Sequence, residues 1–288
     1  MKGTKNMILK KPLKISLILL LIILIILACL AFYSFRIEPF NLQVQKIDLS
    51  KNQNHPLKLV QFSDTHIKPD FTAKNFEKVV DLINNQDADI VVFTGDLYDH
   101  AQKYSDNQNI INLLKNIKAK YLKLAVYGNH DYFNVRSKDQ DKPLNYSEIM
   151  KQGGFTVLKQ KSEIFEIKGK KIFVAGLEYD RSKTPKKFAN PNNKNADYNI
   201  LLCHQPFLYE AYKECDYNLI LAGHTHGGQI NIPFVSKIFT HKDGSNFFAG
   251  LYDLGENKKL YTNIGIGTTR ISARFRAVPE ISVFSLPV

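Results

Sequence analysis

The first apolar segment of the chain is apolar on every side. From 15 to 35 no residue is charged, and nearly all are Leu, Ile, Ala or Phe. A helix of this length rises about 30 Å, the thickness of the hydrocarbon core of a bilayer. A core helix of a soluble protein would instead show a polar face. We therefore predict a transmembrane anchor at 15–35.

The flanks of this segment suggest an orientation. Residues 1–14 contain five lysines and no acidic residue, so the positive-inside rule places them in the cytoplasm and the rest of the chain outside it. Cys29 follows Ala28 in a sequence that loosely resembles a bacterial lipoprotein cleavage box. Because Leu27 is unusual there and apolar residues continue past Cys29, we favour an uncleaved anchor over a lipoprotein.

After a connector that includes a first strand at 36–56, buried strands alternate with amphipathic helices. Short apolar runs predict strands at 57–62, 90–94 and 122–127, and helical spacing predicts helices at 73–85 and 110–117. This alternation is typical of βαβ units and a largely parallel sheet. Further strands are predicted at 155–158, 164–167, 172–175, 198–203, 219–222, 260–262 and 281–286, with a long polar loop at 181–197. We expect one domain at 57–288.

Composition excludes two classes of protein. Six of the 39 basic residues lie in the first 36 positions, which hold no acidic residue, so the remainder carries 33 basic and 27 acidic groups. That body shows no clear basic stripe with interleaved aromatic residues, and we expect no nucleic-acid partner. The three cysteines form neither an even framework nor a metal-binding spacing, which argues against a disulfide scaffold.

Polar side chains follow the predicted strands at the point where each strand ends. The carboxyl ends of strands in open α/β sheets form the binding crevice, so we expect these side chains to lie close together. They are Asp64, His66, Asp96, Asp99, Asn129, His130, Asp131, His204, His224 and His226.

The spacing of these residues suggests metal chemistry. Residues i and i+2 of an extended chain point the same way, so Asp64 and His66 can reach one centre, and so can His224 and His226. Mixed oxygen and imidazole donors suit zinc, iron or manganese. Adding Asp96, Asn129 and His204 gives seven ligands, too many for one tetrahedral ion. Two divalent ions that share a carboxylate can clamp the attacking and leaving oxygens of a phosphoryl displacement.

Five motifs carry a resemblance to a known family. DxH at 64–66, GDxxD at 95–99, GNHD at 128–131, a lone histidine at 204 and GHTH at 223–226 occur in the order that is typical of the calcineurin-like metallophosphoesterase superfamily. The tail at 265–281 and the anchor resemble a membrane-associated bacterial branch of it. The resemblance implies an α/β fold, a four-layer αββα sandwich of two mixed sheets flanked by helices, here preceded by one transmembrane helix.

The resemblance also implies a role for each motif residue. Asp96 bridges two metal ions, a metal-bound hydroxide is the nucleophile, His130 protonates or stabilises the leaving oxygen, and Asp99 orients His130. Asp131 is expected to be supporting. The implied ligands are Asp64, His66 and His226 for the first ion and Asn129, His204 and His224 for the second.

Arginines are candidates for substrate binding because guanidinium groups match phosphate oxygens. Arg181, Arg270, Arg274 and Arg276 are considered, and a solvated surface arginine is at least as common an explanation for each. Arg274 is favoured because an arginine recurs before the Pro-Glu-Ile tail of the branch that the chain resembles. No arginine follows Asp99, unlike the protein-phosphatase branch, so phosphoprotein substrates are less expected.

The sequence thus predicts a membrane-anchored hydrolase of a phosphodiester, phosphomonoester or pyrophosphate bond. The branch resembles hydrolases of the pyrophosphate in UDP-diacylglucosamine, but that reaction is cytoplasmic and conflicts with the predicted orientation. A wall-polymer or phospholipid phosphodiester fits the orientation better. The alternative is a catalytically inactive metal-binding scaffold of the same fold, which the loss of ligands would favour, and here every ligand position is filled.

Overall fold

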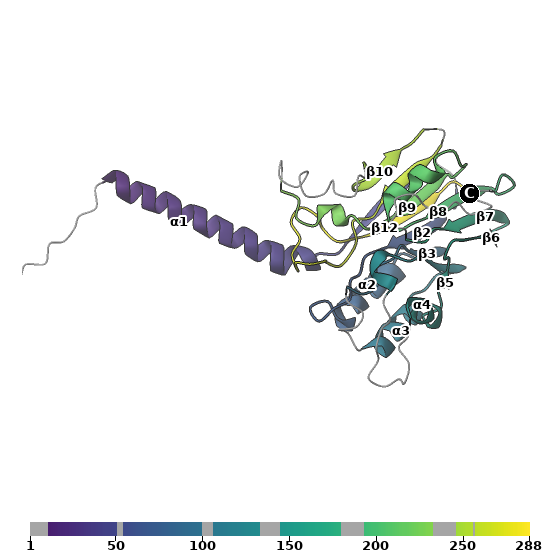
Figure 1. Ribbon diagram of the computed structural model, residues 1–288, viewed down its shortest axis with the longest axis horizontal. Coiled ribbons are helices and arrows are strands. Elements are labelled where there is room, and N and C mark those ends of the chain that lie inside the picture. The colour runs from purple at the N-terminus through teal and green to yellow at the C-terminus, as the bar shows by residue number, and fades with distance from the viewer. Residues whose placement is uncertain are drawn as a thin grey trace, which may run out of the picture.

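The computed structural model describes residues 11–50, 54–99, 106–132, 145–179, 193–232, 246–255 and 257–288. Helix α1 (Lys11–Phe32) continues through the π-helical turn η1 (Tyr33–Ile37) into the 3-10 turn η2 (Glu38–Phe40). Together they project from one end of the body (Figure 1). The helical segment at 12–40 is long and apolar enough to cross a membrane. The predicted anchor is therefore a candidate membrane span.

The body contains two six-stranded mixed sheets. The first has the order β1-β12-β2-β3-β4-β5, and only the β12–β2 pair is antiparallel. Its strands are β1 (Gln43–Asp48), β2 (Leu57–Phe62), β3 (Ile90–Phe93), β4 (Leu122–Ala125), β5 (Thr156–Val157) and β12 (Glu280–Leu286).

The second sheet has the order β10-β11-β9-β8-β7-β6, with antiparallel pairs at its two edges and parallel pairs between them. Its strands are β6 (Lys161–Ile167), β7 (Lys170–Gly176), β8 (Tyr198–Leu202), β9 (Leu219–Ala222), β10 (Gly250–Asp253) and β11 (Lys259–Thr262).

Alternating side chains on each strand explain the layers. On β2, Val60 and Phe62 belong to the apolar cluster shared with helices α2 (Ala73–Asn84), α3 (Asn107–Asn116) and α4 (Tyr146–Gln152). Leu57 and Leu59 point the other way, into the cluster between the two sheets. The outer face of the second sheet packs against the 3-10 segment η5 (Pro206–Tyr212). The layered fold that the resemblance implied is confirmed.

The expected largely parallel pairing is confirmed, since seven of the ten strand pairs in the described residues are parallel. The sheets are mixed because antiparallel pairs join β12 to β2 and close both edges of the second sheet. Helix α4 and strand β10 were not predicted. A signal for α4 was present: Asn145 and Glu148 form a capping box in which each side chain accepts from the other residue's backbone N–H. Most of the predicted loop at 181–197 lies outside the described residues.

Candidate metal centre

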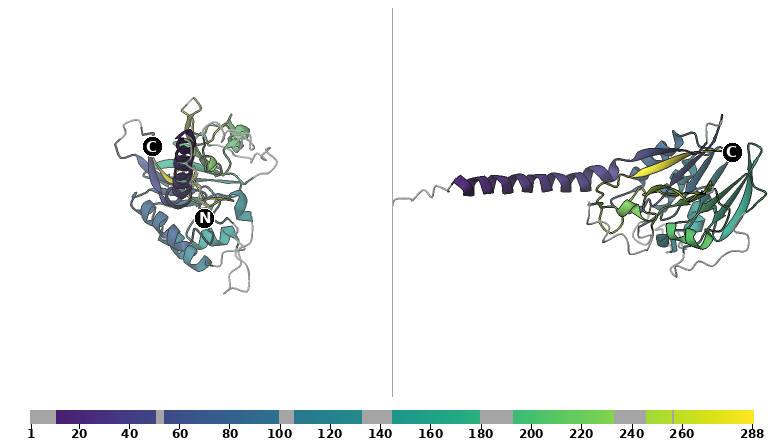
Figure 2. Two further views of the ribbon diagram at one scale, coloured as in Figure 1. Left: turned by 90° about the vertical axis from the view of Figure 1, so that its left-hand side faces the viewer. Right: turned by 90° about the horizontal axis from the view of Figure 1, so that it is seen from above.

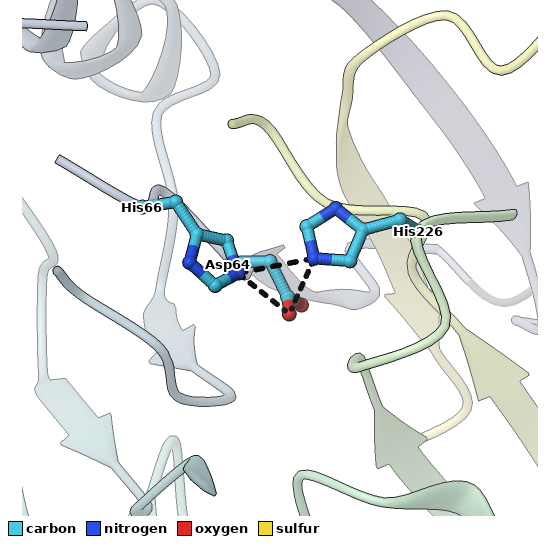
Figure 3. A group of neighbouring side chains, drawn as sticks. All are labelled: Asp64, His66 and His226. Atoms are coloured by element: carbon cyan, nitrogen blue, oxygen red, sulfur yellow. Dashed lines mark hydrogen bonds and ion pairs between the residues drawn. The ribbon is translucent and has the colours of Figure 1, made fainter. Parts of the chain in front are cut away.

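The seven predicted ligands come from loops that follow five parallel strands, three in the first sheet and two in the second. In the first sheet, β2 leads into Asp64 and His66, β3 into Asp96, and β4 into Asn129. In the second sheet, β8 leads into His204, and β9 into His224 and His226. All seven lie within a network of short contacts between the two sheets. Figure 3 shows one part of it, in which Asp64 and His66 meet His226.

The chain turns sharply where it presents these side chains. Asp64, His66, Asp96, His224 and His226 all have a positive φ, between 42° and 73°. This region is uncommon for residues other than glycine and is a recognised feature of functional sites. The backbone is therefore not extended at DxH and GHTH, and the i, i+2 argument from an extended chain does not describe how these side chains converge.

A first cluster forms around Asp64. The Nε2 atoms of His66 and His226 lie 3.0 Å apart. Oδ1 of Asp64 lies 3.8 Å from Nε2 of His66 and 3.4 Å from Nε2 of His226. Donor atoms that bind one ion at about 2 Å lie about 3 to 4 Å from one another, so the separations fit a single ion.

A second cluster forms around His204. Its Nε2 lies 3.1 Å from Oδ1 of Asn129 and 3.2 Å from Nδ1 of His224. Asp96 lies between the two clusters, because its Oδ2 is 3.3 Å from Nε2 of His204 and 3.5 Å from Nε2 of His66. His224 and His226 therefore belong to different clusters, as the family resemblance implied and the spacing alone did not.

Each central carboxylate has one oxygen held by the protein and one directed at the histidines. Oδ2 of Asp64 accepts from the hydroxyl of Ser63 and from the backbone N–H of His224, and Oδ1 has no hydrogen-bond partner among the described residues. Oδ1 of Asp96 accepts from the backbone N–H of His130 at 2.8 Å, and Oδ2 faces His204 and His66. A buried carboxylate oxygen without a donor is costly, and a cation between the clusters would satisfy it.

The electrostatics favour positive charge at the same place. Burial alone would lower the pKa of His204, but the charges of Asp96 and Asp64 outweigh it and raise the pKa to about 10. Burial likewise opposes the shift at His66, where contacts with Asp64 and Asp99 raise the pKa to about 9. Burial would raise the pKa of Asp64, but the charges of His204 and His226 hold it well below its usual range. The donor set thus fits bound divalent cations.

Comparison with known proteins identifies the family. A family model described as calcineurin-like phosphoesterase matches residues 57–228, from the start of β2 to the end of GHTHGG. The chain belongs to the calcineurin-like phosphoesterase family. It is therefore a metal-dependent phosphoester hydrolase. Members of this family use a dinuclear divalent metal site, and the His and Asp clusters lie within the matched region.

Three relatives show how far the similarity extends. The chain is 38% identical to the uncharacterized metallophosphoesterase YkuE of Bacillus subtilis, over 80% of this chain and 78% of that protein. It is 31% identical to the uncharacterized metallophosphoesterase Cj0846 of Campylobacter jejuni, over 98% of this chain and 72% of that protein. It is 25% identical to the phosphodiesterase YaeI of Escherichia coli, over 88% of this chain and 92% of that protein.

Within this calcineurin-like phosphoesterase, His130 lies beside the first cluster. Its Nδ1 is 2.6 Å from the backbone oxygen of Asp99. A carbonyl only accepts, so Nδ1 carries the proton and Nε2 is the nitrogen that can exchange one. The carboxylate of Asp99 is farther away, 3.8 Å from Nδ1 of His130 and 3.5 Å from Nδ1 of His66. Asp99 thus holds His130 chiefly through its backbone, and its carboxylate lies between two histidines.

Asp131 joins two of the motifs. Its carboxylate accepts from the backbone N–H groups of Asp96 at 2.7 Å, Gly128 at 2.8 Å and Leu97 at 2.9 Å. The side chain is buried. Its position matches the supporting role that was expected.

Arg274 is not placed as a phosphate-binding side chain would be. Its side chain is fully buried, and its guanidinium donates to the backbone oxygens of Gly267, Ile264 and Ala277 at 2.6 to 3.1 Å. Nη2 also lies 3.3 Å from Nδ1 of His226. All three guanidinium nitrogens are therefore engaged by the backbone. The other predicted substrate-binding residue, Arg181, lies outside the described residues.

Glycines of the tail were not predicted to shape the site. A Cβ on Gly267 would lie within 3.0 Å of the backbone of Thr65, and one on Gly265 would lie 2.7 Å from Cβ of Asp64. The tail therefore packs directly against the DxH motif. The Gly-Ile-Gly repeat at 265–267 was the available signal, since closely spaced glycines mark close backbone approach.

Proposed function

We propose that the chain is a membrane-anchored, dinuclear-metal phosphodiesterase. The observation that carries the proposal is the convergence of seven oxygen and nitrogen donors from five strand ends, with one oxygen of each central carboxylate directed at the histidines. The arrangement buries two carboxylates side by side, and bound divalent cations would offset their charge.

The two clusters suggest which residues hold each ion. Asp64, His66 and His226 would hold the first, Asn129, His204 and His224 the second, and Oδ2 of Asp96 would bridge them. Bound there, two divalent ions would lower the pKa of a water and neutralise charge on the phosphate. The mixed donor set suits Mn²⁺, iron or Zn²⁺.

His130 is the proposed general acid. Its Nδ1–H is committed to the backbone oxygen of Asp99, which fixes the ring so that Nε2 delivers a proton to the leaving oxygen. Its side chain is 22% exposed, whereas the neighbouring His66 is 1% exposed. His130 is therefore the more accessible of the two to a substrate.

A phosphodiester is the preferred substrate class. The relative YaeI is named a phosphodiesterase, and the chain lacks the arginine after Asp99 that accompanies phosphoprotein substrates in related enzymes. The candidate span at 12–40 and the preceding lysines favour an anchored enzyme whose body lies outside the cytoplasm. A phosphodiester of the cell envelope fits this location better than cytoplasmic UDP-diacylglucosamine.

The activity is tested on the full-length protein purified in detergent and loaded with Mn²⁺, Fe²⁺ or Zn²⁺. Bis(p-nitrophenyl) phosphate reports phosphodiester hydrolysis, and p-nitrophenyl phosphate reports monoester hydrolysis. We expect faster turnover of the diester, and loss of it in Asp96→Asn. The control is His55→Asn, which replaces an exposed histidine outside the motifs. No turnover with any metal, or turnover that survives Asp96→Asn, contradicts the proposal.

The orientation is tested separately. A C-terminal alkaline phosphatase fusion becomes active only outside the cytoplasm, and a C-terminal green fluorescent protein fusion fluoresces only inside it. The proposal predicts phosphatase activity without fluorescence, and the reverse pattern contradicts it.

A further inference from the structure

The end of the candidate span is hydrogen-bonded to the tail of the body. The backbone N–H of Arg274 donates to the backbone oxygen of Ser34 at 2.9 Å, and that of Ala277 donates to Oε1 of Glu38 at 2.6 Å. Glu38 is 1% exposed. Ser34 belongs to the uncharged stretch 15–35, so the tail lies level with the last turn of the apolar helix.

Two loops meet at this level and hold each other in place. They comprise residues 229–232 and 268–276, and we call them the juxtamembrane loops. The side-chain amide of Gln229 donates to the backbone oxygens of Thr269 and Ile271, at 3.1 and 2.8 Å, and its oxygen accepts from the backbone N–H of Thr269 at 2.8 Å. Asn231 donates through its backbone to Phe275 at 2.7 Å. The loops gather at the end of the body from which α1 leaves (Figures 1 and 2).

These loops expose large apolar side chains. Ile271 is 53% exposed and Ile232 is 44% exposed. Phe40, at the end of the helix, is 50% exposed and lines the same shallow pocket as Ser272. The exposed apolar surface of the helix therefore continues onto the body, where water would otherwise cover it.

Basic side chains surround the apolar ones. Arg270 and Arg276 flank Ile271 in the same loop, and Arg36 follows the apolar run of the helix; all three are exposed. Among the described residues, the acidic groups nearby include Asp70, which is half exposed, and Glu38 and Asp99, which are buried. Apolar side chains ringed by arginine are suited to the boundary between acyl chains and anionic headgroups.

The loop at 268–276 and the glycine that precedes it also reach the proposed metal centre. Gly267 packs against the DxH motif, and the hydroxyl of Thr269 donates to Oδ1 of Asp99 at 3.5 Å. Gln229 comes three residues after His226. A surface that binds the bilayer would thus lie beside the residues proposed to act on substrate.

We propose that the juxtamembrane loops insert Ile271 and Ile232 into the anionic bilayer that holds α1, and that this contact turns the metal centre toward phosphodiesters held at the membrane surface. The inference rests on the proposed membrane anchoring, and it does not depend on catalytic turnover. The body is then bound to the membrane at two places, through the helix and through these loops.

The test measures membrane depth in the full-length protein. Cys29 and Cys215 are replaced by alanine, and Cys203 is kept because it is buried. The accessible cysteine introduced by Ile271→Cys then carries a nitrobenzoxadiazole probe. The protein is reconstituted in nanodiscs of phosphatidylcholine and phosphatidylglycerol, with or without lipids that carry a doxyl quencher on the acyl chain. The matched control is Ile164→Cys, which is 51% exposed on β6, far from α1 (Figure 1).

We expect the emission at 271 to shift to the blue and to be quenched by the doxyl lipid, whereas the emission at 164 does neither. Replacing Arg270 and Arg276 by glutamate should reduce quenching at 271 in discs that contain phosphatidylglycerol. Equal behaviour of the two probes, quenched or unquenched, overturns the inference. Because depth is read without substrate, this outcome is distinct from a failure of the hydrolase assay.

Discussion

The backbone N–H of His224 donates to Oδ2 of Asp64 at 3.0 Å. This hydrogen bond joins the end of β9 in the second sheet to the loop after β2 in the first, across 160 residues of sequence. It fixes one oxygen of the carboxylate, so the other is directed at the histidines. The two clusters are thus held together by backbone groups of the same motifs that supply the proposed metal ligands.

Gly223 precedes His224 and lies so close to Asp64 that a side chain at this position would collide with it. A Cβ at this position would lie within 3.0 Å of both Oγ of Ser63 and Oδ2 of Asp64. We therefore expect Gly223→Ala to displace the carboxylate and to weaken Mn²⁺ binding about 10-fold to 100-fold, the usual effect of disturbing groups that orient ligands. Isothermal titration measures the affinity.

Gly169 provides the control for this substitution. It lies in the turn between β6 and β7, and a Cβ there would meet none of the described residues within 4 Å. Its φ is +75°, so asparagine, which tolerates the left-handed region, is the appropriate replacement. Gly169→Asn should bind Mn²⁺ as the wild type does, and unchanged affinity in Gly223→Ala would disprove the argument.

Arg274 is predicted to stabilise the fold. Lysine keeps the charge but cannot reproduce the planar guanidinium that reaches Gly267, Ile264 and Ala277. Arg274→Lys should lower the free energy of unfolding by about 1 to 3 kcal/mol, the cost of leaving buried carbonyls without donors. Arg276→Lys, at an exposed arginine two residues away, should change it by less than about 0.5 kcal/mol.

Denaturant unfolding of the two variants in detergent distinguishes this role from phosphate binding. If Arg274 contacted substrate, Arg274→Lys would raise KM and leave the unfolding midpoint unchanged. That pattern would refute the structural role.

Removing the ring of His130 should lower the rate of catalysis without reducing metal binding. Its backbone N–H contacts Asp96, but its ring contacts Asp99, so removing the ring leaves the hydrogen bond to Asp96. We expect His130→Ala to lower kcat about 10²-fold to 10⁴-fold, the usual contribution of a general acid, with a metal content equal to that of the wild type. Metal analysis and steady-state kinetics on one preparation test this, and a parallel loss of metal would show that His130 acts as a ligand instead.

Metal binding should release protons at neutral pH. In the metal-free protein the carboxylates raise the pKa of His66 to about 9 and that of His204 to about 10. Both rings therefore carry an extra proton at pH 7, and a metal ion must displace it. Affinity for Mn²⁺ should rise with pH up to about 10, the higher of the two pKa values. Titration calorimetry in buffers of different ionisation enthalpy measures the release, and a heat that is independent of the buffer would contradict the expectation.

The proposed ligands could be selected from the sequence because strand ends leave a clear local signal. Asp64, Asp96 and His224 each follow an apolar run, and parallel strands bring such ends to one edge. The division of His224 and His226 between two clusters was less accessible, because it depends on positive φ angles at both residues. The spacing of the two histidines in the sequence does not indicate these backbone angles.

Arg274 shows the limit of the same reasoning. Its residue type and its place in the tail suggested a phosphate ligand, but burial is set by contacts with segments far away in sequence. The chain folds the tail between His226 and the end of the anchor, where each of the three guanidinium nitrogens of Arg274 donates to a backbone carbonyl. No local pattern around position 274 predicts that environment.

The most direct test of the dinuclear centre is anomalous diffraction from crystals of the full-length protein grown with Mn²⁺. The account predicts two manganese peaks about 4 Å apart, one beside His66 and His226, the other beside His204 and His224, with Asp96 in contact with both. A single peak, or peaks away from these side chains, would contradict it.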